Sequence, residues 1–254
     1  MKEKVIKYFD DQAVEYNGKY GRINDLRSFI FAERKRIVLT MLGADRKRIL
    51  DIGCGPGVYT DELSGRCGRL YGVDVSSEMI AIANGKKFRN AEFSVGNIEK
   101  LGFQDGFFDA VVCAGVLEYL DNVEAGIREV ARVTGKNGIA IFTAPNASSI
   151  TNKLDYYLRA FLKVSRKIIK ADISGSFMNY DFEPKLLCGK ELELLLKKYG
   201  FRVERTVFHV FRLSLLNRIN PRLSLYLSKK LNFVSSRFLA INYVVKAVKD
   251  GAAR

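Results

Sequence analysis

A glycine-rich loop between an apolar strand and a helix constrains this chain more than any other feature. The segment reads RILDIGCGPGVYTDEL over Arg48–Leu63. Asp51 comes near the end of the expected strand, and three glycines follow at alternate positions: Gly53, Gly55 and Gly57. Glycine lets the chain turn sharply and approach a ligand with its backbone, because it has no Cβ. The helix expected next offers unpaired N–H groups at its start.

The spacing of this loop separates two classes of cofactor. A dinucleotide-binding loop, Gly-x-Gly-x-x-Gly/Ala, would place a small residue at position 58, where this chain has Val58. Asp51 would also repel a pyrophosphate, whereas it suits a cationic group. The pattern Asp-x-Gly-x-Gly-x-Gly resembles the first motif of class I S-adenosylmethionine-dependent methyltransferases. In that family the loop wraps the methionine end of the cofactor, which implies that Asp51, Gly53, Gly55 and Gly57 bind it.

A second acid follows at the expected distance. Arg69–Val75 reads as a buried strand, and Asp74 near its end lies 21 positions after Gly53, close to the ~20 typical of a ribose-binding acid. Its carboxylate can accept both ribose hydroxyls, with Val75 beside it in the cofactor site. Asp74 could instead cap the helix that the following serines introduce.

Two further strands complete the predicted cofactor site. Glu92–Asn97 reads as a third strand, and the resemblance implies that Asn97 and Ile98 pack on the adenine. The family usually has Asp at this polar position, but an amide can both donate and accept there. Phe108–Ala114 reads as a fourth strand, and we include its Cys113 among the cofactor-binding residues.

Motifs in the following segment narrow the resemblance. Three motifs follow one another in the chain: Phe-Asp-x-Val-Val, x-Val-Leu-Glu-x-Leu and Arg-Val-x-x-x-x-Gly. In this order they resemble the motifs of small-molecule methyltransferases of the quinone-biosynthesis type. A helix is expected over Val123–Val133, then a turn at 135–138 and a fifth strand over Gly138–Thr143. The resemblance covers about residues 45–147.

The resemblance implies a doubly wound α/β fold. Its sheet has seven mostly parallel strands in the order 3-2-1-4-5-7-6, with the last strand antiparallel. We expect one domain over 1–254, with a helical cap at 1–42, a cofactor-binding half at 45–147 and a substrate-side half at 148–254. The remaining elements are expected as helices over Met1–Lys19, Asp25–Leu42 and Gly189–Tyr199, and as strands over Phe201–Val210 and Phe238–Val248.

Composition is typical of a cytoplasmic globular protein. The longest apolar run, Ala110–Leu117, is far shorter than the ~20 residues that cross a bilayer. The first residues, MKEKVIKYFDD, are charged from Lys2, so we expect no secretory signal. The four cysteines lack paired metal-ligand spacing, so we expect neither a zinc site nor a disulfide.

Positive charge is concentrated in the second half of the chain. Residues 1–147 hold 21 Lys and Arg against 20 Asp and Glu, whereas residues 148–254 hold 21 against 8. From Arg205 to Lys249 there is no acid, against nine Lys and Arg. Such asymmetry indicates an anionic partner: a phosphorylated substrate, a membrane surface or a nucleic acid.

Two basic insertions, at about 150–185 and 211–237, bear on that partner. Leu154–Lys170 has large apolar residues at mostly helical spacing and a basic remainder, as in a membrane-surface helix or a lid over a hydrophobic substrate. Phe211–Phe233 combines leucines with arginines and could form an interfacial hairpin. The first could equally pack on its own domain with solvated lysines, and the second could simply be a substrate-side insertion. Nucleic acid is less favoured, because the basic residues alternate with leucine and isoleucine, and Asn/Asp-Pro-Pro-Tyr is missing after strand four.

Few residues could act as a catalytic base. The cofactor's methyl group is already activated, so the enzyme must mainly position and desolvate the acceptor, but a hydroxyl acceptor must lose its proton. The candidates are His209, the one histidine, and Glu118 and Tyr119 just past strand four. Quinone O-methyltransferases have Glu-x-x-Glu-His there, which is thought to hold a metal; this chain has Gly115, Glu118 and Tyr119, so we predict none. Tyr16 and Tyr20 could cover the cofactor or substrate, or simply pack within their helix.

The sequence thus predicts an S-adenosylmethionine-dependent methyltransferase that acts on a small or lipid-linked acceptor, at oxygen, with association to a membrane surface left open. The alternatives are an RNA methyltransferase and a non-catalytic binding protein of the same fold. The oligomeric state is left open.

Overall fold

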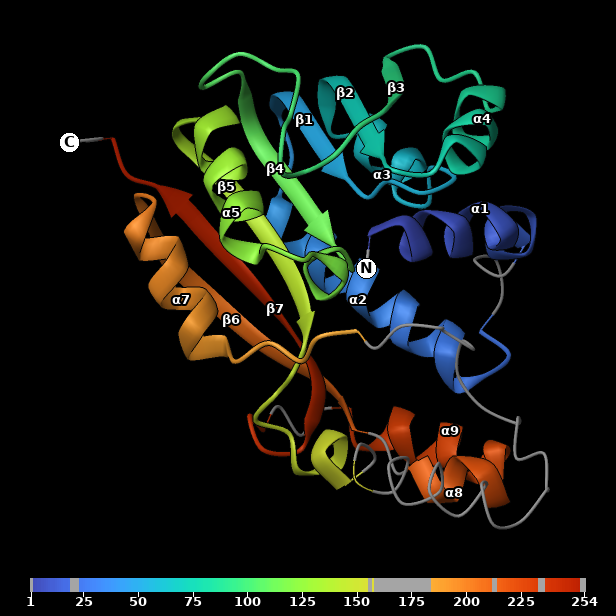
Figure 1. Ribbon diagram of the computed structural model, residues 1–254. Coiled ribbons are helices and arrows are strands. Elements are labelled where there is room, and N and C mark those ends of the chain that lie inside the picture. The colour runs from blue at the N-terminus through green and yellow to red at the C-terminus, as the bar shows by residue number, and fades with distance from the viewer. Residues whose placement is uncertain are drawn as a thin grey trace.

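A seven-stranded sheet forms the centre of the computed structural model (Figure 1), which describes residues 2–18, 23–154, 157, 184–211, 214–232 and 236–251. The strand order is β3-β2-β1-β4-β5-β7-β6, and β7 runs antiparallel to both β5 and β6. This confirms the predicted doubly wound fold. The strands are β1 (Arg46–Ile52), β2 (Cys67–Asp74), β3 (Ala91–Val95), β4 (Phe108–Ala114), β5 (Thr134–Pro145), β6 (Phe201–Phe211) and β7 (Ala240–Lys249).

Helices cover both faces of the sheet. The described helices are α1 (Lys2–Gly18), α2 (Leu26–Leu42), α3 (Thr60–Ser64), α4 (Ser77–Gly85), α5 (Val123–Val133), α7 (Gly189–Lys198), α8 (Ser214–Ile219) and α9 (Pro221–Lys230), with a short 3-10 turn, η1, at Leu117–Tyr119. Apolar residues of α5 and α7 share one core with the sheet, and those of α2 and α3 share a second.

Strand β4 shows why the central strands read as uninterrupted apolar runs. Val111 and Cys113 face the core under α5 and α7, whereas Ala110 and Val112 face the core under α2. Because both faces are buried, alternation between polar and apolar residues disappears.

A bulge separates the start of β5 from the rest of the strand. Thr134 pairs with Phe108 and Ile139 with Ala110, so residues 135–138 protrude, and Asn137 has a φ of 60°. The turn predicted before strand five therefore lies within the strand, because Thr134 already pairs with β4.

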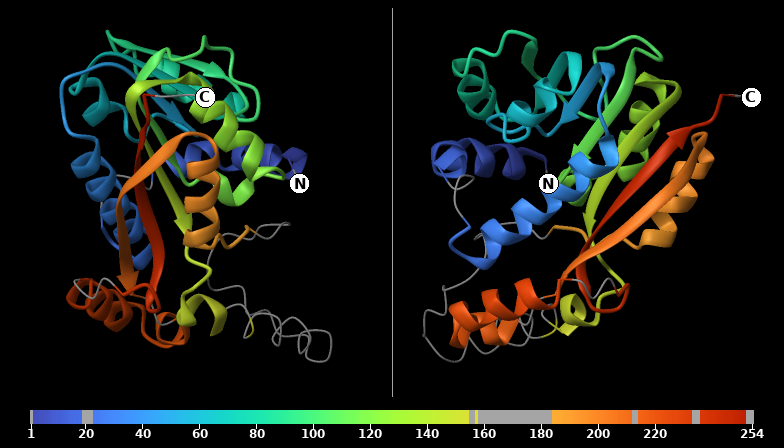
Figure 2. Two further views of the ribbon diagram at one scale, coloured as in Figure 1. Left: turned by 90° about the vertical axis from the view of Figure 1, so that its left-hand side faces the viewer. Right: turned by 180° about the vertical axis from the view of Figure 1, so that it is seen from behind.

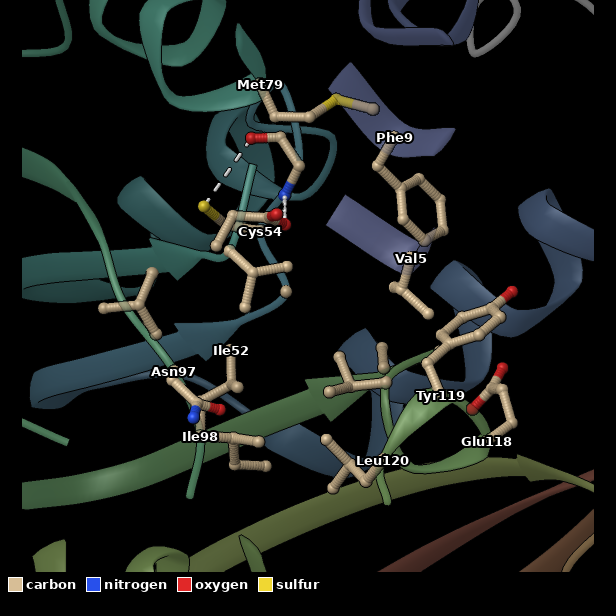
Figure 3. Close-up of a pocket in the computed structure, with 18 of the residues that line it drawn as sticks. Val5, Phe9, Ile52, Cys54, Met79, Asn97, Ile98, Glu118, Tyr119 and Leu120 are labelled. Carbon is tan, nitrogen blue, oxygen red and sulfur yellow. Dashed lines mark hydrogen bonds between the residues drawn. The ribbon is translucent and has the colours of Figure 1, made fainter. Parts of the chain in front are cut away.

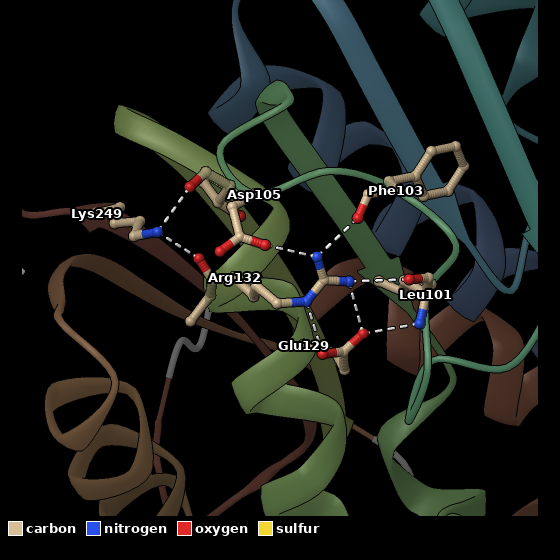
Figure 4. A network of polar contacts seen from close by, with 8 residues as sticks. Leu101, Phe103, Asp105, Glu129, Arg132 and Lys249 are labelled. Atoms are coloured by element: carbon tan, nitrogen blue, oxygen red, sulfur yellow. Dashed lines mark hydrogen bonds and ion pairs between the residues drawn. The ribbon is translucent and has the colours of Figure 1, made fainter.

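A partly buried network joins the loop after β3 to α5 (Figure 4). Arg132 donates to the carbonyl oxygens of Leu101 and Phe103 at 2.8 and 2.7 Å, and it pairs with Glu129 and Asp105. Glu129 in turn accepts from the N–H of Leu101. The network fixes the loop that leads from β3 to β4.

The structure describes most of the second basic insertion but little of the first. The helix predicted over Leu154–Lys170 lies largely outside the described residues, as does most of 150–185. The second insertion forms α8 and α9 and lies between β6 and β7 in the chain, as predicted. Within the described residues, no helix is both long and apolar enough to span a membrane.

Candidate cofactor and acceptor site

A pocket opens at the carboxyl ends of β1, β2 and β4, where ligands bind in open α/β sheets (Figure 3). Its walls come from the glycine loop, from the residues that follow β2, β3 and β4, and from α1 and α2. It encloses about 1140 Å³ of empty space, part of it open to solvent. A concave, mainly apolar pocket with a few polar groups is the usual kind of site for a small ligand.

The glycine loop forms the part of the wall nearest to β1. Gly53 and Gly55 line the pocket and have φ of 69° and 53°, in the left-handed region that favours glycine. A Cβ on Gly53 would lie 2.3 Å from Cγ2 of Val116. Two constraints, backbone conformation and close packing, therefore require glycine at this position.

Asp74 presents its carboxylate to the pocket from the end of β2. One oxygen accepts from the N–H of Gly55 at 2.8 Å, and the other accepts from the N–H of Ser76 at 3.0 Å. Ser76 caps α4, because its hydroxyl accepts from the N–H of Met79. Burial raises the pKa of Asp74, and the backbone donors oppose that rise. Asp74 is thus fixed by the glycine loop itself and does not serve as the helix cap.

The opposite side of the pocket is mainly apolar. Figure 3 shows Ile52 and Ile98 next to Asn97, and Leu120 and Val75 line the pocket as well. The amide of Asn97 accepts from the N–H of Glu99 at 3.2 Å and donates to its carboxylate at 3.4 Å. This side combines apolar surface with one amide, which suits a flat heterocycle.

Helices α1 and α2, which the resemblance implied as a helical cap at 1–42, supply a further wall of the pocket. Val5, Phe9 and Tyr16 of α1 line the pocket, and so do Phe31 and Arg34 of α2. Tyr16 was predicted to cover the cofactor or substrate, whereas Tyr20 lies outside the described residues. Val5, Phe9, Phe31 and Arg34 were not predicted, because the resemblance indicated the two helices without showing which of their side chains face the pocket.

Glu118 and Tyr119 lie in η1, directly after β4, and both line the pocket. The Tyr119 ring meets Phe9 edge to face, with ring centres 5.4 Å apart (Figure 3). Burial raises the pKa of Glu118 to about 7, although Arg34 lowers it in part. The Oε2 atom of Glu118 has no hydrogen-bond partner among the described residues. The pocket therefore contains a carboxyl group that changes charge near neutral pH.

Comparison with known proteins identifies the family. A profile described as a methyltransferase domain matches residues 50–142. Demethylmenaquinone methyltransferase from Beutenbergia cavernae is 31% identical over 174 residues, which cover 66% of this chain and 70% of that protein. The chain belongs to the methyltransferase family. This confirms the membership that the motifs predicted.

Two further relatives support the assignment. Demethylmenaquinone methyltransferase from Thermotoga maritima is 28% identical over 216 residues, which cover 80% of this methyltransferase and 90% of that relative. Magnesium protoporphyrin IX methyltransferase from Synechocystis PCC 6803, solved with bound SAH, gives a TM-score of 0.69 at 17% identity. That likeness covers 98% of this chain and 100% of that chain, and it shows a common fold.

Three predicted cofactor residues of this methyltransferase lie behind the pocket wall. Gly57, with a φ of 77°, shapes the loop, and Cys113 is buried in the sheet, where burial raises its thiol pKa. Asp51 is also buried, and its Oδ2 atom has no hydrogen-bond partner among the described residues. Burial and the charge of Asp74 raise the pKa of Asp51 to about 8, and Arg34 opposes them. Direct contact of these three residues with a ligand remains a prediction.

His209 lies on β6, outside the residues that line the pocket. It is buried, and burial together with the charges of Arg34 and Arg36 lowers its pKa to about 3. An imidazole with so low a pKa is a weak base at neutral pH. We therefore do not assign the role of catalytic base to His209.

Proposed function

We propose that this methyltransferase binds S-adenosylmethionine in the pocket and transfers its methyl group to an oxygen atom of a small or lipid-linked acceptor. The observation that carries the proposal is the juxtaposition of Asp74 with the glycine loop. Each Asp74 oxygen accepts one backbone N–H and keeps acceptor capacity for a ribose hydroxyl. Gly53 and Gly55 line the pocket without a side chain, so the loop presents its backbone to a ligand.

The remaining wall fits the other parts of this cofactor. Asn97 would meet the edge of the adenine, while Ile98 and Val75 would cover its faces and exclude water. When bound, the cofactor supplies a methyl group that is already activated for transfer. The protein's own contribution is then to orient the acceptor, to exclude water and to take up a proton.

Glu118 is the residue that we assign to proton removal from the acceptor hydroxyl. It lies in the pocket, one of its oxygens is unpartnered among the described residues, and its pKa of about 7 suits a general base at neutral pH. Tyr119 and Phe9 would form an apolar contact for an aromatic or prenylated acceptor. The quinone-biosynthesis names of the relatives support an acceptor of this kind.

Calorimetric titration tests the cofactor assignment. S-adenosylmethionine should bind with micromolar affinity and NADH should not. Asp74→Asn should weaken binding about 10- to 100-fold, because hydrogen bonds to a charged group contribute about 1.5–3 kcal/mol. Asp61→Asn, at an exposed acid of α3, is the matched control and should bind normally. Preference for NADH, or unchanged affinity in Asp74→Asn, would contradict the proposal.

Turnover with labelled cofactor tests the acceptor assignment. Lipid and small-molecule extracts should contain an acceptor, and mass spectrometry with NMR of the product should place the new methyl group on oxygen. Methylation of RNA in place of these extracts would support the RNA alternative. Cofactor binding without turnover on any extract would support the non-catalytic alternative.

A further inference from the structure

Helix α9 buries two serines and exposes two large apolar side chains, while its Leu225 packs on the apolar cluster around Phe29 and Val210. Its buried residues are Ser224 and Ser228, one turn apart. The Ser224 hydroxyl has no hydrogen-bond partner among the described residues. Leu223 and Tyr226, in contrast, are 42% and 56% exposed. A helix that buries serine and exposes leucine and tyrosine has an outer face suited to an apolar environment.

Further apolar side chains are exposed at the same end of the molecule. Ile219, at the end of α8, is 80% exposed and lies four positions before Leu223, across the break between α8 and α9 at Asn220. The chain after β5 and the chain before β7 lie beside this hairpin in both views of Figure 2. The N–H of Ile150 donates to the carbonyl of Phe238 at 2.8 Å, which ties these two segments together. We call the exposed apolar residues here the end surface: Ile150, Leu154, Tyr157, Ile219, Leu223, Tyr226 and Phe238.

The charge around the end surface is positive. Arg222, Lys229 and Lys230 are exposed on α9, and no acid occurs from Arg205 to Lys249. The carboxylate of Glu33 on α2 accepts a hydrogen bond from Asn232, but its charge is paired with that of Arg36. Apolar side chains bordered by lysine and arginine match the boundary between acyl chains and anionic headgroups. Four of the seven end-surface residues, Ile150, Leu154, Ile219 and Leu223, are aliphatic and cannot stack on bases, so the surface matches lipid better than RNA.

We propose that the end surface docks this methyltransferase on the anionic face of a lipid bilayer. The apolar side chains enter the acyl boundary, and the basic residues of α9 contact the headgroups. The inference deepens the proposed function, because a lipid-linked acceptor would be met at its own membrane. Its physical basis, however, is independent of methyl transfer.

Vesicle co-sedimentation tests the proposal with the full chain. We expect binding to vesicles of phosphatidylcholine with 30% phosphatidylglycerol, weakening as salt rises, and little binding to phosphatidylcholine alone. Ile219→Asp with Leu223→Asp should abolish measurable binding. Arg222→Gln with Lys229→Gln and Lys230→Gln should weaken it about 100-fold, at roughly fivefold for each basic residue near an anionic surface.

Leu194→Asp provides the matched apolar control. Leu194 is 68% exposed on α7, outside the end surface, and its replacement should leave vesicle binding unchanged. Circular dichroism and S-adenosylmethionine titration on every variant separate the two proposals. Vesicle binding without cofactor binding would reject the proposed function alone, whereas cofactor binding without vesicle binding would reject docking alone.

Three other outcomes would overturn the docking proposal. The first is equal loss of vesicle binding in the Leu194→Asp control. The second is self-association in sedimentation velocity that Ile219→Asp with Leu223→Asp abolishes, while vesicles are not bound; the end surface would then join two copies of the chain. The third is salt-dependent RNA binding through α9 in place of vesicle binding.

Discussion

At Gly53 the backbone turns with a φ of 69°, and Val116 occupies the space that a side chain would need. Gly53→Ala should therefore combine left-handed strain of about 1–2 kcal/mol with a steric clash that displaces Val116 from the pocket wall. We expect S-adenosylmethionine affinity to fall at least 100-fold, with lower thermal stability, as measured by calorimetry and thermal unfolding.

Gly85→Ala is the control for that substitution. Gly85 ends α4, has no positive φ, and nothing lies within 4 Å of an added Cβ. Its replacement should leave stability unchanged or raise it by up to about 1 kcal/mol. Normal cofactor binding by Gly53→Ala would show that the loop does not contact the ligand.

The raised pKa of Glu118 predicts how enzymatic activity depends on pH. If this carboxylate removes the acceptor proton, it must be ionised, and kcat/KM should rise with pH through an apparent pKa of about 7. Glu118→Gln should lose this ionisation and lower kcat about 10²- to 10⁴-fold, while S-adenosylmethionine affinity stays within a fewfold. Glu78→Gln, at an exposed position of α4, should leave the profile unchanged. The same apparent pKa in Glu118→Gln would assign the ionisation to another group.

Sequence reasoning at the residue scale found Asp74 but missed Arg34. Asp74 could be predicted because strand, loop and second strand fix its separation from Gly53. Arg34 lies within the run Glu33-Arg34-Lys35-Arg36, where local sequence does not reveal which cation faces inward. Only the packing of α2 beside Gly115 places its guanidinium at the pocket.

Helices and strands whose bounds are set by neighbouring residues in the sequence could be predicted, whereas features that depend on contacts with distant residues could not. The bounds of β4 and α5 agree with the sequence, because an apolar run and a 3.6-residue period define them. The bulge in β5 could not be predicted, since it depends on Thr134 pairing with Phe108 of another strand. The burial of Ser224 and Ser228 and the exposure of Leu223 on α9 also escaped prediction, because leucines and serines alternate there without showing which face the core covers.

The loop between β3 and β4 depends on one side chain of α5. Arg132→Ala would remove donors from two partly buried carbonyl oxygens and leave Glu129 without its cation. We expect a loss of about 1–3 kcal/mol in the free energy of unfolding, measured by urea denaturation. Arg128→Ala, exposed on the same helix, should change it by less than about 0.5 kcal/mol. Equal effects in the two variants would mean that the network adds little stability.

Stability of the whole molecule should depend on the buried carboxyls. Asp51 has a folded pKa of about 8, well above its ordinary value of 3.8, so the folded state binds more protons than the unfolded state between these limits. The free energy of unfolding therefore falls as pH rises from about 5 to 8, by up to about 1.4 kcal/mol per pH unit for this group.

Asp51→Asn removes the ionisable group and should flatten this dependence. The variant should be more stable than the wild type at pH 8, as measured by denaturation across the pH range without cofactor. Asp61→Asn, which is exposed, should retain the wild-type slope. A slope unchanged in Asp51→Asn would show that Asp51 titrates at an ordinary pKa.

Helix α1 forms part of the pocket wall without joining the sheet. Its Asp10 accepts from the hydroxyl of Ser76, at the start of α4, at 2.6 Å (Figure 1 shows α1 alongside α4). Under the proposed function, Val5 and Phe9 would contact the bound cofactor from this helix. Substitutions that strengthen those contacts should then also slow the release of spent cofactor. We therefore expect tighter binding at α1 to lower the turnover frequency.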